Sequence, residues 1–203
     1  MVCIAVDQLY CYAGHNSKQE LMKQTIAVYG DSFAVNTPGS WVNTLSSIYS
    51  TQVFSQPGCS EYKIYQQILN NATVADIIIV SHTSWSRIPV EHHPVHTSGF
   101  HEHCDLLYAD CEANGITSAT EFFQNHFWEQ FWLDTYKLYR QQIVDQLSDR
   151  KVIHLDFFDH GLASEQCHID FSNLPTQFPG SVCHMNQQGN DSVSITLEEY
   201  LSA

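Results

Sequence analysis

The sequence predicts an α/β protein in which a mainly parallel sheet is covered by helices on both faces. Short apolar runs alternate with segments of helical periodicity, a pattern typical of parallel sheets. Residues 76–80 form a nearly uninterrupted β-branched run, as expected for a strand covered on both sides. With 203 residues, 43% of them hydrophobic, the chain is large enough for one domain with a full core.

The elements follow in order along the chain. Strands are expected at 26–29, 52–55, 76–80 and 151–156. Helices are expected at 41–49, 61–70, 118–147 and 187–202. A capping box, Ser118 to Glu121, opens the third helix, and we expect its broad aromatic face to be core. We expect one domain over 1–203, with an N-terminal extension at 1–24, a His-rich insertion at about 85–117 and a loop at 157–183.

Composition and charge exclude several classes of protein. The 22 acidic and 8 basic residues give a formal net charge of −14, which argues against a nucleic-acid-binding surface and against docking on anionic membranes. No apolar run approaches the roughly 20 residues of a membrane span, and the start of the chain is a poor signal peptide. The seven cysteines are scattered and form no CxxC pair. We therefore predict reduced thiols and a cytoplasmic location.

Polar loops follow the first three strands. They are Gly30 to Phe33, Pro57 to Ser60, and Ser81 to Ser84. Because the carboxyl ends of parallel strands share one edge of a sheet, these loops are expected to converge there. A serine on such a loop becomes a nucleophile when a base reaches it and N–H donors hold the developing oxyanion.

These loops, and the segment His184 to Asn190, resemble the motif blocks of the SGNH hydrolases, also called GDSL esterases or lipases. Gly30-Asp31-Ser32-Phe33 is similar to the nucleophile block, with Phe in place of the usual Leu. The resemblance implies a flavodoxin-like three-layer fold, with Ser32 as nucleophile and as an oxyanion donor through its backbone N–H. It implies Gly58 as a second donor and His184 as the general base.

Two positions depart from the family pattern. Where the family has Gly-x-Asn-Asp, this chain has His82-Thr83-Ser84-Trp85. Ser84 stands at the Asn position, and a hydroxyl can donate; His82 is another candidate donor. Ser181 replaces the Asp that lies three residues before the histidine. His184 then works in a Ser–His dyad, or Asp170 or another acid reaches it, or activity is weak or lost.

The insertion gathers histidines whose role the sequence leaves open. His92, His93, His96, His101, His103 and Cys104 lie close together. Imidazole and thiolate are zinc ligands, and the candidates are His92, His96, His101, His103 and Cys104. Their spacing matches no common zinc pattern, so a solvated loop that contacts substrate is the alternative. The insertion is also expected to overhang Ser32, with His82, Trp85 and Arg87 shaping the pocket.

The resemblance implies a serine esterase without a cofactor, acting on substrates such as O-acetylated sugars, short acyl esters, lipids or thioesters. The sequence shows no evident long apolar groove, which favours a small acyl, acetyl-like ester on a polar alcohol. The expected partner is a small-molecule ester or an acylated carbohydrate, and the oligomeric state is not indicated. A non-catalytic binding module on the same fold is one alternative. A zinc-binding protein that uses the His-rich insertion is another.

Overall fold

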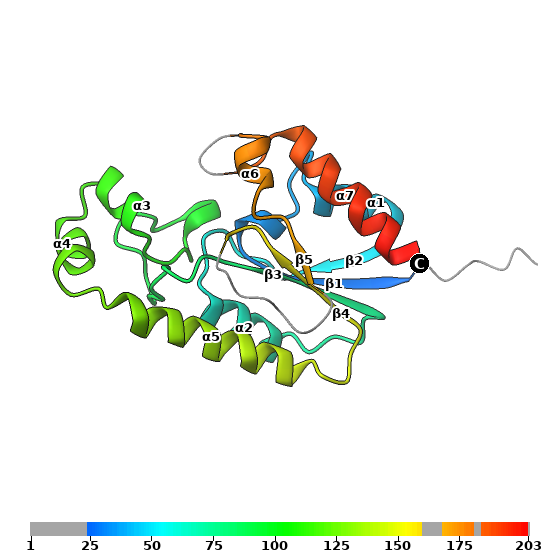
Figure 1. Ribbon diagram of the computed structural model, residues 1–203, viewed down its shortest axis with the longest axis horizontal. Coiled ribbons are helices and arrows are strands. Elements are labelled where there is room, and N and C mark those ends of the chain that lie inside the picture. Colours follow the sequence, from blue (N-terminus) through cyan, green and yellow to red (C-terminus); the bar gives the residue numbers. More distant parts are fainter. Residues whose placement is uncertain (1–23, 160–167, 181–183, 203) are drawn as a thin grey trace, which may run out of the picture.

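The protein is built on one parallel sheet, seen edge-on in the computed structural model (Figure 1), which describes residues 24–159, 168–180 and 184–202. All pairings in its five strands are parallel, and the order is β2-β1-β3-β4-β5. This is the order of flavodoxin-like doubly wound sheets, whose switch point lies between β1 and β3. The strands are β1 Thr25–Gly30, β2 Ser50–Val53, β3 Ile77–His82, β4 Val152–Asp156 and β5 His168–Asp170.

Helices cover both faces of the sheet, which confirms the predicted α/β class and its three layers. On one side lie α1 Trp41–Ile48, α6 Leu174–Gln177 and α7 Gln187–Ser202; on the other lie α2 Glu61–Asn70 and α5 Glu129–Gln146 (Figure 1). Alternate residues of β1 divide between the two cores: Ile26 and Val28 pack with α1 and α7, whereas Ala27 and Tyr29 pack with α2 and α5. Both sets are buried because both faces are covered.

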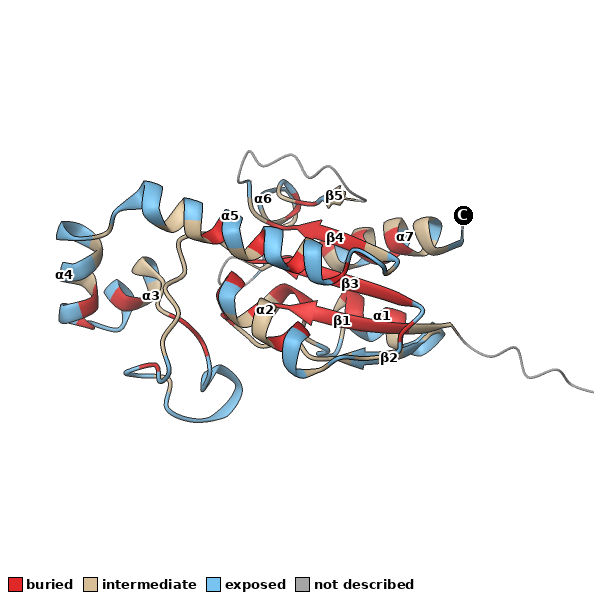
Figure 2. Cartoon of the chain, turned by 90° about the horizontal axis from the view of Figure 1, so that it is seen from below, coloured by how far each residue is buried: buried red, intermediate tan, exposed pale blue. Residues whose placement is uncertain are grey.

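The segment between β3 and α5 projects beyond the end of the sheet. It contains the 3₁₀ turn η2 Gly99–His101, α3 Tyr108–Ala113 and α4 Thr117–Asn125. Figure 2 shows the contrast: the central strands are buried, whereas the α3–α4 region is largely exposed. A small cluster around Cys111, Ile116 and Ala119 forms its own apolar centre.

The expected long helix at 118–147 is in fact two helices, α4 and α5. Helix α4 begins at Thr117 after Ile116, which makes no side-chain cap, so the predicted capping box at Ser118 is wrong. The predicted aromatic core is also wrong in part: Trp128 is 68% exposed and Phe131 49%, while Tyr136 is buried. The reason is that α4 and the start of α5 extend past the sheet, where no strand covers them (Figure 1).

Other differences concern short elements with no periodicity of their own. Strand β2 lies two residues earlier than expected, at the sheet edge. The expected loop at 157–183 contains β5 and α6, and the expected irregular insertion contains η2 and α3. Such short pieces form because neighbouring strands and helices supply their partners. Most of the expected N-terminal extension, residues 1–23, lies outside the described residues.

The structure bears on two predictions made from the composition, which concern membrane spans and the state of the cysteines. Among the described residues, no helix combines the length and apolar character that a membrane crossing requires. Cys59, Cys104 and Cys111 are buried free thiols, as predicted; the other cysteines lie outside the described residues.

A buried ion pair ties α5 to the sheet, and we expect its loss to be costly. Arg140 donates two hydrogen bonds to the Asp156 carboxylate, at 2.8 and 2.7 Å, and both residues are under 9% exposed. Arg140→Met keeps the apolar stem but removes the guanidinium. Among the described residues, the Asp156 carboxylate then keeps only its ion-pair contact with His168. Unfolding in denaturant should show a loss of about 3 to 5 kcal/mol.

Lys137→Met, on the same helix, is the matched control, because Lys137 is 44% exposed and lies 4.0 Å from Asp134. Its effect should stay below about 1 kcal/mol. Equal effects of the two substitutions would contradict the role given to the buried pair.

Candidate functional site

The candidate site lies at the carboxyl edge of the sheet, at the switch point between β1 and β3. Gly30 pairs with Ser81 across these strands, so the turn that carries Ser32 lies beside the segment that follows β3. The turn at Gly58, which follows β2, reaches the same edge. The predicted convergence of the three loops is therefore confirmed, and it occurs where doubly wound sheets bind their ligands.

Hydrogen bonds from the buried side chains of Gln67, Asp31 and Trp41 hold the turn that carries Ser32. Gln67 of α2 clamps Gly30: its Nε2 donates to the Gly30 carbonyl (3.1 Å), and its Oε1 accepts from the Gly30 N–H (3.0 Å). Asp31 caps the short helix η1 Ser32–Ala34 by accepting from the Phe33 N–H (3.0 Å). Trp41, fully buried, donates from its indole to the Phe33 carbonyl (2.6 Å). Ser32 is thus presented from a rigid turn.

A glycine is required at position 30 because the turn approaches β3 too closely for a side chain. A Cβ there would lie 2.7 Å from both Cβ and the carbonyl oxygen of Ser81. The Gly-Asp-Ser motif therefore has a structural reason for each residue: close approach at Gly30, a cap at Asp31 and a partly exposed hydroxyl at Ser32.

His184 is brought to the same place from the far end of the chain. Gly180 donates to the His184 carbonyl (2.7 Å), and Asn186 donates to the Phe178 carbonyl (2.9 Å), so an antiparallel bridge holds the histidine just before α7. Its ring packs on Phe33, with 4.7 Å between centroids. Burial lowers the pKa of His184, and the nearby Arg87 and His101 add to the effect. The ring is therefore neutral at pH 7, as a general base must be.

Ser32 and His184 line one cavity of about 260 Å³ together with Gly58, Ser84 and Arg87. The insertion also lines this cavity, with His96, His101, Cys104, Asp105, Leu107 and Asp110. The prediction that the insertion overhangs Ser32 is therefore confirmed. A second cavity of about 330 Å³ also reaches Ser32 and His184, along residues 37–40 and the start of α7.

Arg87 links the loops that follow β2 and β3. Its Nε donates to Thr83 Oγ1 (3.0 Å), and its Nη1 donates to the Gly58 carbonyl (3.2 Å). Thr83 in turn donates to the Asp31 carboxylate (3.0 Å). Gly58 has φ +65°, and a Cβ there would lie 2.8 Å from Cβ of Cys104. The turn thus admits only glycine, and it packs directly on the insertion.

Asp31 is a buried carboxyl group next to Ser32 in the chain. It is fully buried, and desolvation raises its pKa to about 6 despite the opposing effects of Arg87, the Phe33 N–H and Thr83. Both of its oxygens are occupied by the turn and by Thr83. Its position makes it a positioning residue for the Ser32 turn.

His82 was a candidate oxyanion donor, and the structure contradicts this. Its ring is fully buried, with Nδ1 2.5 Å from the Glu61 carboxylate and Nε2 2.9 Å from Nδ1 of His154. The side chain points into the layer between the sheet and helices α2 and α5. It is therefore part of a buried polar network beneath the site, and it does not face the cavity.

Other predicted site residues also lie away from the Ser32 cavities. Asp170 is exposed, accepts from the Ser172 N–H (2.8 Å) and lines neither cavity. Trp85 stacks near Phe127 (6.0 Å between centroids) and lines a separate hollow against α5, so its predicted place in the Ser32 pocket is wrong. Ser84 does face the cavity, and its hydroxyl pairs with that of Ser86 (2.9 Å).

The histidine candidates separate into two groups. His92 and His103 are exposed, and His103 meets Lys63 only through its backbone carbonyl (2.9 Å). His96 and Cys104 come together with His93, while His101 lies beside His96 (5.6 Å between centroids). The proline at position 94 does not prevent this meeting, because a loop rather than a helix presents the histidines.

Sequence reasoning missed the residues that act from beneath the site. Glu61 and Gln67 are both buried on α2. A signal existed: they share the helical spacing of the apolar residues Ile64 and Ile68, so polar side chains stood on a face that had to be covered. Asp110 was also missed, since a single Asp in an irregular segment carries no pattern.

Comparisons with known proteins add no family assignment: neither the protein-family models nor the curated proteins contain a match to this chain. The site is therefore interpreted from its own geometry.

The buried network beneath the site predicts acid sensitivity. Burial lowers the pKa of His154 to about 3, with further lowering by His82 and Arg140. An unfolded histidine takes up a proton near pH 6.5, so the unfolded state binds more protons as the pH falls from 6.5 towards 3. The free energy of unfolding should decrease over this window, by up to about 1.4 kcal/mol per pH unit from this group.

Denaturant unfolding between pH 7 and pH 4 checks this. His154→Gln keeps a hydrogen-bond acceptor for His82 but does not titrate, so it should reduce the dependence of the free energy of unfolding on pH. His92→Gln, at an exposed position, should leave that dependence unchanged. An unaltered slope in the His154 variant would contradict the assignment.

Proposed function

We propose that the protein is a serine ester hydrolase of the SGNH type. The observation that supports this most is that Ser32 and His184 line one cavity at the switch point of a parallel sheet. A nucleophile, a neutral imidazole and backbone N–H donors on rigid turns are the parts that acyl transfer needs. The Gly-Asp-Ser turn and the His184 segment also match the SGNH blocks in type and order.

In the proposed reaction, Ser32 Oγ attacks the ester carbonyl while His184 removes its proton. The backbone N–H groups of Ser32 and Gly58 hold the oxyanion, with Ser84 as a further donor from the same cavity. His184 passes the proton to the leaving alcohol, and the acyl group stays on Ser32. Water activated by His184 then releases the acid and regenerates the serine.

Arg87 supports the oxyanion site from below. Its guanidinium donates to the Gly58 carbonyl (3.2 Å) and so fixes the turn whose N–H is a proposed donor. It also places a positive charge in the cavity where negative charge develops in the transition state.

His184 acts in a dyad in this proposal. No hydrogen bond or ion pair joins its side chain to a carboxylate among the described residues, and Asp170 lies elsewhere. Its ring is oriented instead by packing on Phe33 (4.7 Å). A dyad lacks the carboxylate that stabilises the imidazolium, so we expect slower turnover than in a complete triad.

The cavity favours a small acyl group on a polar alcohol. Its volume of about 260 Å³ suits a small acyl group better than a fatty acyl chain, and Phe33, Leu107 and Phe158 line it beside histidine, serine, arginine and aspartate side chains that can bind a polar alcohol. An acetyl-like ester, including one on a carbohydrate, fits this chemistry.

A non-catalytic binding module on the same fold is the second candidate. The observation that favours it is the missing carboxylate partner of His184 among the described residues. Such a module would bind the same kind of polar ligand in the same cavity without turnover.

Labelling with a fluorophosphonate distinguishes these two functions. The reagent phosphonylates serines that a neighbouring base activates. We expect a single adduct on Ser32, located by peptide mapping, which disappears in Ser32→Ala and slows at least about 100-fold in His184→Ala.

Ser47→Ala is the control, because Ser47 is exposed on α1 and its hydroxyl donates only to the Thr44 carbonyl (2.7 Å). It should label like the unchanged protein. If the folded protein forms no adduct, esterase function is rejected in favour of the binding module.

The rate of labelling should also report the lowered pKa of His184. Only the neutral imidazole is a base, so a lowered pKa keeps the protein reactive at a pH below the usual 6.5 of histidine. Arg87→Gln removes a charge that lowers this pKa, and we expect it to move the acidic limb of the rate profile to higher pH. Lys137→Gln, on α5 and outside both Ser32 cavities, should leave the acidic limb of the rate profile unchanged.

A further inference from the structure

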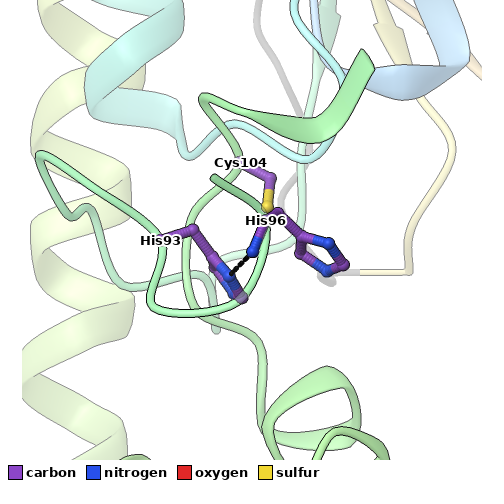
Figure 3. Close-up of side chains that lie close together, drawn as sticks. All are labelled: His93, His96 and Cys104. Carbon is purple, nitrogen blue, oxygen red and sulfur yellow. Dashed lines mark hydrogen bonds between the residues drawn. The ribbon is translucent and has the colours of Figure 1, made fainter. Parts of the chain in front are cut away.

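The insertion contains a second cluster of reactive side chains, part of which lines the Ser32 cavity. His93, His96 and Cys104 converge there, and a ligand atom of each lies within 4.8 Å of the others (Figure 3). Asp110 faces both histidines from α3. His96, Cys104 and Asp110 line the Ser32 cavity, but none of the four residues has a catalytic step in the proposed ester hydrolysis, so their convergence requires a separate explanation.

We propose that His93, His96, Cys104 and Asp110 bind a zinc ion. The inference goes beyond the proposed function and does not rest on it. Three independent features of the described residues support it: the separations of the ligand atoms, the buried polar atoms without partners, and the chemistry of the donor set.

Two of the separations match those of a tetrahedral site, and both join Asp110 to a histidine. Two ligands about 2.05 Å from zinc at the tetrahedral angle are about 3.3 Å apart. Nε2 of His93 lies 3.2 Å from Asp110 Oδ2, and Nε2 of His96 lies 3.3 Å from the same oxygen. The Cys104 sulfur lies within 4.8 Å of a ring nitrogen of each histidine, and closing the site requires its side chain to move towards them.

Two of the proposed ligand atoms are buried without a hydrogen-bond partner among the described residues. They are His93 Nε2 and Asp110 Oδ2. Although these atoms are close, they are not aligned as a hydrogen bond. The His93 side chain is completely buried, so water does not satisfy its nitrogen from outside. Polar atoms left in this way are costly, and a cation between them would satisfy both.

Besides the movement of Cys104, metal binding replaces the contact between His96 Nε2 and Asp110 Oδ1 (3.4 Å) and changes the hydrogen bonds of His93. Its Nδ1 accepts from the backbone N–H groups of His96 (3.1 Å) and Val95 (3.3 Å), so the neutral ring carries its proton on Nε2. Ligation by Nε2 moves that proton to Nδ1 and releases these two contacts. Both are long and share one acceptor, so they are weak beside the bonds that a structural zinc ion makes. Cys104 binds as thiolate and releases its proton to solvent.

The donor set selects the metal. Imidazole and thiolate favour zinc over magnesium or calcium, which prefer oxygen ligands. Four protein ligands make a closed, structural site rather than one that activates water. Because Cys104 also packs on Gly58, a zinc ion here would fix the insertion against the turn that supplies a proposed oxyanion donor.

Metal titration of the full chain tests this. The protein is stripped with a chelator and dialysed, and Zn²⁺ binding is followed by competition with a chromophoric chelator and by elemental analysis. We expect about one zinc per chain. Co²⁺ in place of zinc should give the near-ultraviolet charge-transfer absorption of a metal–thiolate bond.

Matched variants locate the site. His96→Gln and Cys104→Ser should each weaken zinc binding more than about 100-fold, and Cys104→Ser should abolish the cobalt–thiolate absorption. His103→Gln and Cys111→Ser, at an exposed histidine and a buried cysteine of the same segment, should do neither. Circular dichroism checks that each variant folds. If Cys104→Ser does not fold, His96→Gln still tests the proposal, because His96 is 28% exposed.

Failure to bind zinc, or equal binding by the His96 variant and its control, would overturn the proposal. Fluorophosphonate labelling of Ser32 is measured on the same samples. Labelling is scored on the zinc-loaded protein, and none of the four zinc ligands takes part in it, so a protein that binds zinc but does not label, or the reverse, shows which of the two proposals has failed.

Discussion

The parallel pairing of β1 with β3 is the constraint on which the site depends. Gly30 pairs with Ser81 across the two strands, so closely that a side chain at position 30 would clash. This contact sets the turn of Ser32 beside the segment that carries Thr83 and Arg87. The side chains of Asp31, Thr83 and Arg87 then join the turns in one chain of hydrogen bonds.

Buried polar groups lie beneath the carboxyl edge of the sheet. They make the site rigid, although removing them from water costs free energy. Glu61, His82 and His154 form one group, and Arg140, Asp156 and His168 another. The pKa values of His154 and Asp156 move in the directions that keep one neutral and the other charged. Such networks are costly where a polar atom is left unpaired, as His154 Nε2 is among the described residues. Their place under the site is consistent with a need for fixed geometry there.

Much of the fold was predictable because the central elements are strongly patterned. The strand at 76–80 and the helices at 41–49 and 61–70 were placed within one or two residues. The long third helix was misjudged, since aromatic residues at helical spacing do not reveal where the sheet ends. Trp128 and Phe131 lie beyond it and are exposed. Short elements such as β5 lacked any pattern and depend on their neighbours.

The sequence by itself determined the class of fold, the Gly-Asp-Ser turn after the first strand and the convergence of the loops, because apolar periodicity and strand order are local or follow from parallel pairing. Only the tertiary structure decided that His82 and Asp170 lie away from the cavity, that Arg87 joins two turns, and that His93 and Asp110 meet His96 and Cys104. The direction of a side chain depends on which neighbour it packs against, and that neighbour lies far away in the sequence.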